Sequence, residues 1–295
     1  MIWGATWLWW AGFHAAVVAL LAADAALATR FRRSARLAIL WTALLVLISA
    51  LFAVWIAAAR GRETALEFIA GYAIEGSLSL DNLVVFLVIF KSFRAGVHRQ
   101  HQALMWGIGG AIVLRALFIA AGVTLLNHFE WVTWIFGLFL LYAAWRMFAG
   151  GSAHEALPGW MMRLRRAEGS AGGVVPLFWL IVSVEVTDLI FAVDSVPAVL
   201  AVSHNPFVVY TSNIAAILGL RSLYFALAAL LSRLRRLHLG LAALLAFIAI
   251  EMLASPWYKL SIGVSLAVVA VILAATALDS VIGRDKVRAS TGEKS

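Results

Sequence analysis

The sequence lacks cysteine and is poor in charge. No cysteine occurs among its 295 residues, which excludes disulfides, zinc-thiolate sites and thiol chemistry. Any metal must therefore be held by oxygen or imidazole ligands. Charged residues make up only 13% of the chain and hydrophobic residues 64%, whereas a soluble domain is about a quarter charged. We therefore expect an integral membrane protein whose main partner is the lipid bilayer.

The basic residues that are present do not indicate a nucleic-acid surface. The formal net charge is +8, but the Lys and Arg side chains fall almost wholly in short connections between apolar runs. Basic residues in such connections set the orientation of a membrane protein. We expect no nucleic-acid partner.

Apolar runs recur along the chain at the length of a membrane crossing, which is about 20 residues. The first run has no basic residues before it, unlike a signal peptide, and we expect it to be retained as a helix. The fold class is therefore all-α and polytopic, with about nine transmembrane helices. The predicted crossings are 2–28, 37–59, 66–90, 103–126, 131–148, 174–202, 207–231, 239–253 and 260–282.

The distribution of basic residues supports this count. Of the 23 Lys and Arg residues, 18 fall in one alternate set of connections, and only Arg60, Arg62 and Lys259 fall in the other. Cytoplasmic connections collect Lys and Arg, so the N-terminus should lie outside and the C-terminus in the cytoplasm, in the cytoplasmic (inner) membrane. The remaining two, Arg115 and Arg221, lie inside predicted crossings.

Two acidic clusters lie inside apolar runs. The first is Glu75-Gly-Ser-Leu-Ser-Leu-Asp81-Asn82, and the second runs from Glu185 through Asp188 to Asp194. Ionisable groups at membrane depth are costly unless they are paired or bind an ion, so they mark candidate functional sites. We expect the two clusters to form one shared site.

The clusters belong to a repeat of three crossings, in which Arg115 falls in register with Arg221. An odd number of crossings inverts the second copy, and inverted repeats are typical of secondary transporters. The expected division is 1–62 for two N-terminal crossings, 63–150 for the first repeat, 151–173 for a cytoplasmic linker, 174–254 for the second repeat, and 255–295 for the last crossing and a cytoplasmic tail.

The spacing within the clusters predicts broken helices. Glu75 and Asp81 would be about 240° apart on an unbroken helix, so they can face one ion only if their segment unwinds. Gly76, Ser77 and Ser79 between them make a break there possible. Glu185 and Asp188, three residues apart, already share a face. Pro197 provides a helix break in the second cluster, because proline removes a helical hydrogen bond.

Oxygen ligands of this kind suit Mn2+, Mg2+ or Ca2+. Five carboxylates against two arginines give a formal charge of −3, which a divalent cation reduces to −1. A proton could remove the remainder, as coupling of metal to protons requires. The candidate metal ligands are Glu75, Asp81, Asn82, Glu185, Asp188 and Asp194, and the candidate supporting residues are Ser79, Arg115, Ser195, Asn213 and Arg221.

Blander interpretations remain open for several residues. The acids could serve only as structural partners of the two arginines, and for Asp24 and His14 a structural or interfacial role is favoured over ligation. Gly107, Gly109 and Gly110 are most simply helix-packing positions. The sequence offers no nucleophile-base pair and no HExxH motif, so we do not expect an enzyme or a permanently bound cofactor.

The two clusters, together with the segments downstream of them, resemble a known family. The motifs are Glu-x-Ser-Leu-Ser-x-Asp-Asn with a downstream Gly-Ala-x-Val-x-Arg, and Val-Glu-x-Thr-Asp-x-x-Phe-Ala-x-Asp-Ser-x-Pro-Ala followed by Thr-Ser-Asn-x-x-Ala-x-Leu-Gly-Leu-Arg. They are similar to those of the TerC family of integral membrane proteins, and the resemblance covers about residues 63–253.

The resemblance implies a multi-pass bacterial-type membrane protein, associated with tellurium resistance and with efflux of manganese from the cytoplasm. It also implies that the acidic motifs form the cation site and that Arg115 and Arg221 are the family's buried arginines. One departure is Glu251, which stands where the family commonly has a lysine. A non-transporting role in metal delivery or membrane-protein assembly stays open, as does the direction of transport.

Overall fold

The computed structural model describes residues 6–31, 35–129, 131–150, 176–231, 237–258 and 260–291. Within these ranges every regular element is a helix, as the composition predicted. The helices are α1 (Trp7–Phe31), α2 (Ala35–Arg60), α3 (Arg62–Ser92), α4 (Val97–His128), α5 (Val132–Gly150), α7 (Leu177–Val202), α8 (Pro206–Leu218), α9 (Leu220–Leu231), α10 (Leu237–Ala254) and α11 (Ile262–Thr291).

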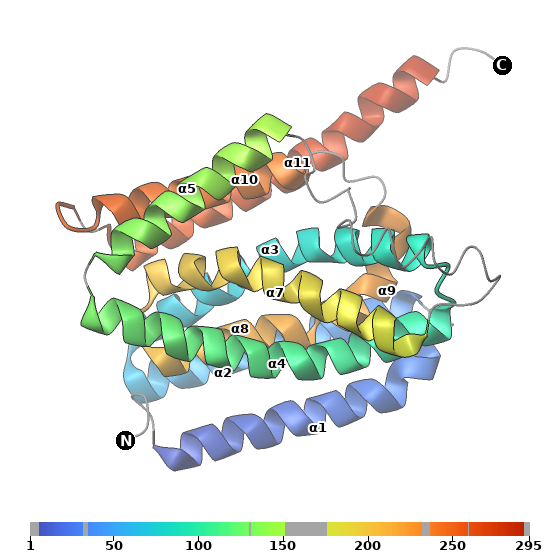
Figure 1. Ribbon diagram of the computed structural model, residues 1–295, viewed down its shortest axis with the longest axis horizontal. Coiled ribbons are helices and arrows are strands. Elements are labelled where there is room, and N and C mark those ends of the chain that lie inside the picture. Colours follow the sequence, from blue (N-terminus) through green and yellow to red (C-terminus); the bar gives the residue numbers. More distant parts are fainter. Residues whose placement is uncertain are drawn as a thin grey trace.

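The helices lie side by side, and the chain reverses direction at its short connections (Figure 1). A central group holds α3, α4, α7 and α8, in which α3 packs against α7 and α8 while α4 packs mainly against α7. A second group, α5, α10 and α11, is centred on the long contact between α5 and α10. Helix α1 runs along the outer edge of the central group and touches α2, α8 and α9.

Six segments of the described residues are long and apolar enough to cross a membrane. They are 7–27, 36–60, 62–92, 97–128, 132–149 and 206–226, and shorter apolar helices occupy 239–254 and 262–276. Helix α7 has the length of a crossing, but it carries Glu185, Asp188 and Asp194. A polytopic helical membrane protein is thus confirmed, and the count of nine crossings stays a prediction.

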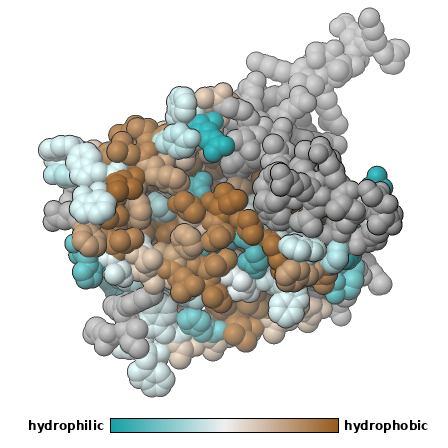
Figure 2. Space-filling model, viewed as in Figure 1, coloured by the Kyte–Doolittle hydropathy of each residue, from teal (hydrophilic) through white to brown (hydrophobic). Residues whose placement is uncertain are grey.

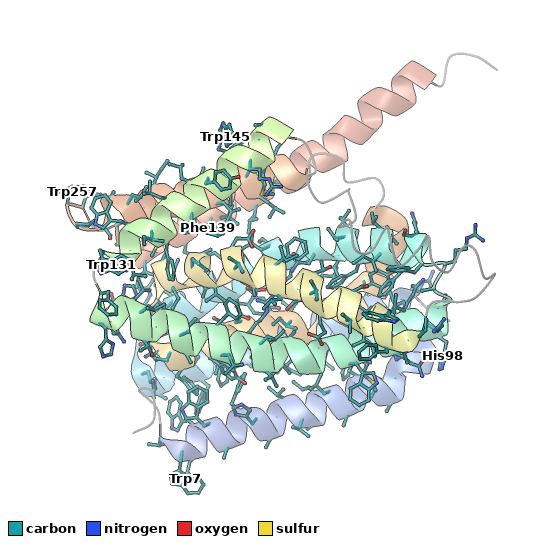
Figure 3. All side chains as sticks on the ribbon, in the orientation of Figure 1. Trp7, His98, Trp131, Phe139, Trp145 and Trp257 are labelled. Atoms are coloured by element: carbon teal, nitrogen blue, oxygen red, sulfur yellow. The ribbon has the colours of Figure 1, made fainter. Side chains whose placement is uncertain are left out.

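The outer surface suits a lipid environment. Large apolar side chains such as Val113, Leu117 and Leu138 are exposed, and hydrophobic residues dominate much of the face drawn in Figure 2. Trp7, Trp131 and Trp257 lie at one end of the helices, and His98 lies at the other (Figure 3). Tryptophan gathers at membrane–water interfaces, so this end of the bundle has the character of an interface.

The predicted breaks at the acidic clusters are absent. Helix α3 runs unbroken through Gly76 to Ser79, and α7 continues through Pro197. An interior glycine costs only about 1 kcal/mol, and the hydroxyl of Ser77 donates to the carbonyl of Ala73 at 2.5 Å. Unsatisfied backbone groups are far more costly in an apolar setting, so the unbroken helix is favoured.

A break occurs instead within the predicted crossing 207–231. Asn205 starts α8 by accepting a hydrogen bond from the backbone N–H of Phe207 at 3.1 Å, with Pro206 at the first helical position, where its missing N–H costs nothing. Helix α8 ends at Leu218, Gly219 forms a turn, and α9 begins at Leu220. The interruption therefore lies beside Arg221.

Two predicted segments, the C-terminal tail and the linker 151–173, lie partly or wholly outside the described residues. Helix α11 continues to Thr291, so the predicted cytoplasmic tail is helical as far as that residue. The predicted linker, 151–173, lies outside the described residues.

Candidate cation site

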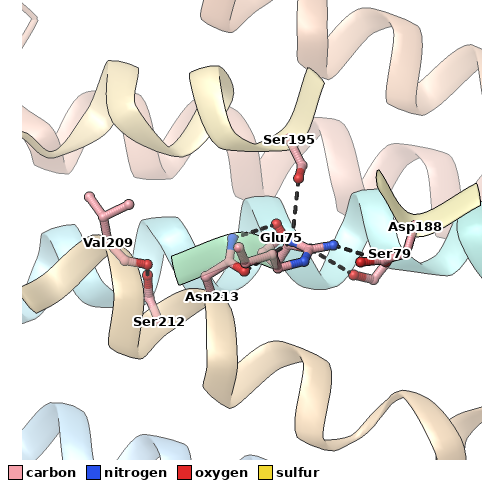
Figure 4. A network of polar contacts seen from close by, with 8 residues as sticks. Glu75, Ser79, Asp188, Ser195, Val209, Ser212 and Asn213 are labelled. Carbon is pink, nitrogen blue, oxygen red and sulfur yellow. Dashed lines mark hydrogen bonds and ion pairs between the residues drawn. The ribbon is translucent and has the colours of Figure 1, made fainter. Parts of the chain in front are cut away.

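The centre of the candidate site is Arg115, a fully buried side chain of α4. Its guanidinium forms ion pairs with acids from two other helices, Glu75 and Asp188, which are drawn in Figure 4. Nη1 is 2.5 Å from Oε1 of Glu75 on α3, and Nη2 is 3.3 Å from Oδ1 of Asp188 on α7. The positively charged side chain of Arg115 therefore bridges the two acidic segments that the sequence predicted to share one site.

Neutral side chains complete the shell around this arginine. Nη1 of Arg115 donates to Oδ1 of Asn213 at 2.9 Å and to the hydroxyl of Ser195 at 3.3 Å. Both partners are buried, with exposed fractions of 0% for Asn213 and 2% for Ser195. Helix α8 thus contributes to the site through Asn213, and α7 contributes through Ser195 in addition to Asp188.

Both carboxylate oxygens of Glu75 are engaged. Ser79, one turn along α3, donates its hydroxyl to Oε1 at 3.0 Å, and Nδ2 of Asn213 donates to Oε2 at 2.8 Å. Asn213 therefore presents its oxygen to the arginine and its nitrogen to the acid, which fixes the orientation of its amide. Glu75 is completely buried, so each of these contacts replaces a contact with water.

Two carboxylate oxygens on the α7 side of the site are still able to accept a hydrogen bond or bind a cation. In the described part of the chain, Oδ2 of Asp188 and Oε2 of Glu185 are buried without a hydrogen-bond partner. Buried polar atoms in native proteins almost always have a partner, so each exception requires an explanation. These two oxygens, one helical turn apart on α7, are candidates to bind a cation or a proton.

Small residues of α4 let α7 come close enough to build this arrangement. A Cβ atom added at Gly110 would overlap the carboxylate of Glu185, and one added at Gly107 would lie 2.9 Å from a methyl of Val184. Gly109 has open space around it. The packing role predicted for these glycines thus fits Gly107 and Gly110.

Two further candidate ligands, Asn82 and Asp194, line a small cavity. Asn82 of α3 and Asp194 of α7 line a cavity of about 10 Å³ between α3, α5, α7 and α10, with Met147 in its wall. Such a volume holds about one water molecule. On the unbroken α3, Asn82 is seven residues from Glu75, so both fall on one face of the helix. Residue 81 belongs to α3, but its side chain is outside the described part.

Arg221 lies outside this network. Its Nη2 forms an ion pair with Oδ2 of Asp24 on α1, and both side chains are buried. The sequence had suggested that Arg221 counterbalances acids of the repeats. The structure pairs it with Asp24, because α1 packs along the start of α9.

The predicted ligands thus fall into separate places. The structure brings together Glu75, Ser79, Arg115, Asp188, Ser195 and Asn213, with Glu185 one turn from Asp188. Asn82 and Asp194 line the small cavity described above. Among the described residues no three His, Asp or Glu side chains are arranged to hold one metal ion. A site shared by all six predicted ligands stays a prediction.

The sequence interpretation missed the partner of Arg221. Asp24 is an acid inside an apolar run, and that signal marks it as needing a positive partner. It also missed Gly71, where an added Cβ would lie 2.6 Å from the hydroxyl oxygen of Ser212. This close approach brings α3 and α8 together one turn from Glu75 and directly beside Asn213.

Comparison with known proteins agrees with the motifs. The family model described as "Integral membrane protein TerC family" matches residues 60–287. An uncharacterized membrane protein, STKORF319, of Myxococcus xanthus is 39% identical, over 92% of each chain. Alx of Escherichia coli K12, named as a candidate membrane-bound redox modulator, is 37% identical over 91% of this chain and 92% of its own. No solved structure matches.

Proposed function

Since the chain belongs to the TerC family of integral membrane proteins, we propose that it transports divalent cations, Mn2+ foremost, out of the cytoplasm. The observation that carries this proposal is the excess of buried acid around Arg115. Glu75 and Asp188 contact one guanidinium, and Glu185 lies one turn from Asp188. Three carboxylates against one arginine leave negative charge at membrane depth that a cation can neutralise.

Arg115 acts in this proposal as a tethered cation that fills the site when no metal is bound. A divalent ion that enters between Glu75 and Asp188 displaces the guanidinium from one or both acids. Oδ2 of Asp188 and Oε2 of Glu185, which have no hydrogen-bond partner among the described residues, form an initial binding site in this proposal, because they can bind the ion before the arginine has moved. Carboxylate and amide oxygens are suitable ligands for Mn2+.

The packing supports a transporter built from two related halves. In the repeat, α3 corresponds to α7, α4 corresponds to α8–α9, and α5 corresponds to α10. The contact of α4 with α7 in one half then corresponds to the contact of α8 with α3 in the other, and both contacts are present. The contacts of α3 with α7 and of α5 with α10 each correspond to themselves. Such symmetry is expected of the inverted repeat that the sequence suggested, in which each half rocks about a site near the midplane.

The outward direction in this proposal comes from the family resemblance, and the predicted topology indicates which end of the helices faces outside. Tryptophans gather at the end of the helices where connections should lie outside (Figure 3), and basic residues gather in the connections predicted to be cytoplasmic. The cytoplasmic membrane of a bacterial cell is the natural location, since the relatives are bacterial. A metal exporter placed there moves Mn2+ outward, with protons as the candidate counter-ion.

Other functions receive less support. A role like that in the name of Alx would have to proceed without thiols, since the sequence has no cysteine. Metal delivery to another membrane protein, or tellurium resistance by a different mechanism, would use the same acids without flux. An enzyme would need a nucleophile and a base, which the sequence does not offer.

Flux measurement separates these functions. Purified protein is reconstituted in liposomes that contain a dye quenched by Mn2+, and uptake is followed for the native chain and for Glu75→Gln. We expect Mn2+ uptake in the native protein and none above empty liposomes in Glu75→Gln. Glu251→Gln is the control, because Glu251 is likewise an acid in an apolar helix that accepts a hydrogen bond from a serine, Ser265 of α11. It is half-buried, whereas Glu75 is completely buried, and it lies in the other helix group. Equal flux in Glu75→Gln and the native chain would reject the proposed site.

A further inference from the structure

A groove on the outer edge of the bundle has no role in the proposed transport. It lies between α1, α2 and α8, has a volume of about 470 Å³ and is open to the surroundings of the protein. Its wall is formed by apolar and aromatic side chains, among them Phe13, Val17 and Phe52. The hydroxyl of Ser49, which also lines it, donates to the carbonyl of Leu45 at 2.9 Å, so the wall offers no unsatisfied donor there.

We propose that this groove binds one acyl chain of an anionic phospholipid, whose headgroup is held by Arg60. The medium around these helices is lipid, so an open apolar groove is filled by hydrocarbon rather than water. The inference does not rest on metal transport, because none of its residues belongs to the cation site.

The length of the groove matches one leaflet. Its α1 wall runs from Leu8 to Leu20, which is about 18 Å at 1.5 Å per residue. Half of a hydrocarbon core about 30 Å thick is about 15 Å. An acyl chain entering at the Leu8 end therefore reaches the membrane midplane at the Leu20 end.

The Leu8 end has the features of a headgroup region. Trp9 and Trp55 line the groove there and pack against each other in a tilted arrangement, with ring centroids 4.1 Å apart. Trp7, two residues before Trp9, is at the end of the helices that carries Trp131 and Trp257 (Figure 3). Tryptophan rings of this kind lie at the level of lipid headgroups.

A positive charge stands at the same end. The guanidinium carbon of Arg60 lies 4.5 Å from the ring centroid of Trp9 and 5.2 Å from that of Phe207. Arg60 is one of only three basic residues assigned to the predicted outer connections, so orientation of the chain does not explain it. A guanidinium held over a ring that lines the groove is placed to meet a lipid phosphate, and a net anionic headgroup gains most from it.

The loose docking of α1 explains why the groove stays open. The polar contacts of α1 in the described part of the chain include the ion pair of Asp24 with Arg221 and the 3.0 Å contact of His14 Nε2 with the hydroxyl of Tyr210. Gly12 faces the groove, and an added Cβ there would meet nothing within 4 Å. Small residues at Gly12 and Ala16 leave the space that the acyl chain would fill.

Photo-crosslinking tests the groove directly. The full-length protein is purified in mild detergent and incubated with phosphatidylglycerol that carries a diazirine on its acyl chain, and crosslinked peptides are identified by mass spectrometry. We expect crosslinks on α1 and α2 residues of the groove. Gly12→Leu and Ala16→Leu should each reduce them at least fivefold, while Ala15→Leu, an exposed position of α1 outside the groove, should leave them unchanged.

The headgroup is tested by competition. Unlabelled phosphatidylglycerol should displace the probe at a lower concentration than phosphatidylcholine does, and Arg60→Gln should remove this difference while Arg60→Lys retains part of it. Unchanged labelling in both groove-filling variants, or equal loss in Ala15→Leu, would overturn the acyl-chain site. Equal competition by the two lipids in the native protein would overturn the role of Arg60. Thermal midpoints of all variants establish folding, and having two groove-filling variants keeps the test valid if one fails to fold.

Discussion

The two buried arginines of this protein are matched in the sequence but differ in their surroundings. Arg115 lies among two acids, an amide and a hydroxyl, with a third acid nearby. Among the side chains that the structure describes, Arg221 forms an ion pair with one acid, Asp24. A one-to-one pair is neutral and resembles a structural tie between helices. An arginine with more acids than it can neutralise leaves a charge for something else to bind.

The origin of the partners reinforces this difference. The acids around Arg115 come from α3 and α7, the first helices of the two predicted repeats, so any relative motion of the halves changes its contacts. Asp24 comes from α1, which precedes the repeats. Arg221 thus connects the second half to the N-terminal helices, whereas Arg115 connects the halves to each other.

The largest effect is expected from removing the central arginine. Arg115→Gln leaves the carboxylates of Glu75 and Asp188 buried without a positive partner, which costs about 3–5 kcal/mol for a buried pair. We expect this loss in the free energy of unfolding, measured by denaturation in mixed micelles, together with loss of Mn2+ uptake in liposomes.

A second substitution separates stability from transport at this site. Adding Glu75→Gln to Arg115→Gln removes the acid closest to the lost charge, so part of the stability should return while Mn2+ uptake stays absent. If Arg115→Gln unfolds no more readily than the native chain, the ion pairs of Arg115 do not contribute to its stability.

The next effect concerns Asp24 and Arg221. Arg221→Met alone should cost about 3–5 kcal/mol, because it strands a buried acid, but Asp24→Leu combined with Arg221→Met should be close to native stability, as replaced buried pairs often are. The double variant should retain Mn2+ uptake within about twofold. Loss of uptake in a stable double variant would mean that Arg221 takes part in transport after all.

How far the sequence could predict the site follows from these pairs. An acid or arginine in an apolar run must find an opposite charge, so the sequence could name Glu75, Arg115, Asp188 and Asp24 as members of buried pairs. It could not assign the partners, because these depend on which helices pack together. The pairing of Arg221 with Asp24 was not predicted for this reason, since the register of Arg221 in the repeat says nothing about α1.

The course of the helices shows a similar limit. Length and apolar character were enough to predict where helices occur, but the breaks were predicted at Gly76–Ser79 and Pro197 and one lies at Gly219. Glycine, serine and proline permit a break without requiring one. In an apolar surrounding the backbone keeps its hydrogen bonds wherever packing allows.

A smaller effect is expected at the contact of α4 with α7. In Gly110→Ala the new methyl overlaps the carboxylate of Glu185, but this carboxylate is the far end of a flexible side chain and can turn away, so the free energy of unfolding should change by less than about 1 kcal/mol. Mn2+ uptake should fall severalfold because Glu185 is displaced. Gly109→Ala, with open space around it, is the matched control and should be neutral or slightly stabilising. Equal effects at both positions would mean that helix propensity, not contact with Glu185, determines the result.

The smallest effect is expected where α2 is joined to α9, next to Arg221. The hydroxyls of Thr42 and Ser222 lie 2.9 Å apart, yet Thr42 also lies 2.9 Å from the carbonyl of Ala38 and Ser222 3.1 Å from that of Gly219. Each hydroxyl has one hydrogen, so only two of these three contacts can be hydrogen bonds at once.

The coupling between the two hydroxyls should therefore be weak. Interhelical hydrogen bonds in membranes average about 0.6 kcal/mol, and we expect the double-mutant cycle of Thr42→Val and Ser222→Ala to give at most this value, with Mn2+ uptake unchanged. The coupling is obtained from unfolding free energies of the two single variants, the double variant and the native chain. A coupling well above about 1 kcal/mol would show that one hydroxyl gives up the carbonyl of its own helix to bind the hydroxyl of the other helix.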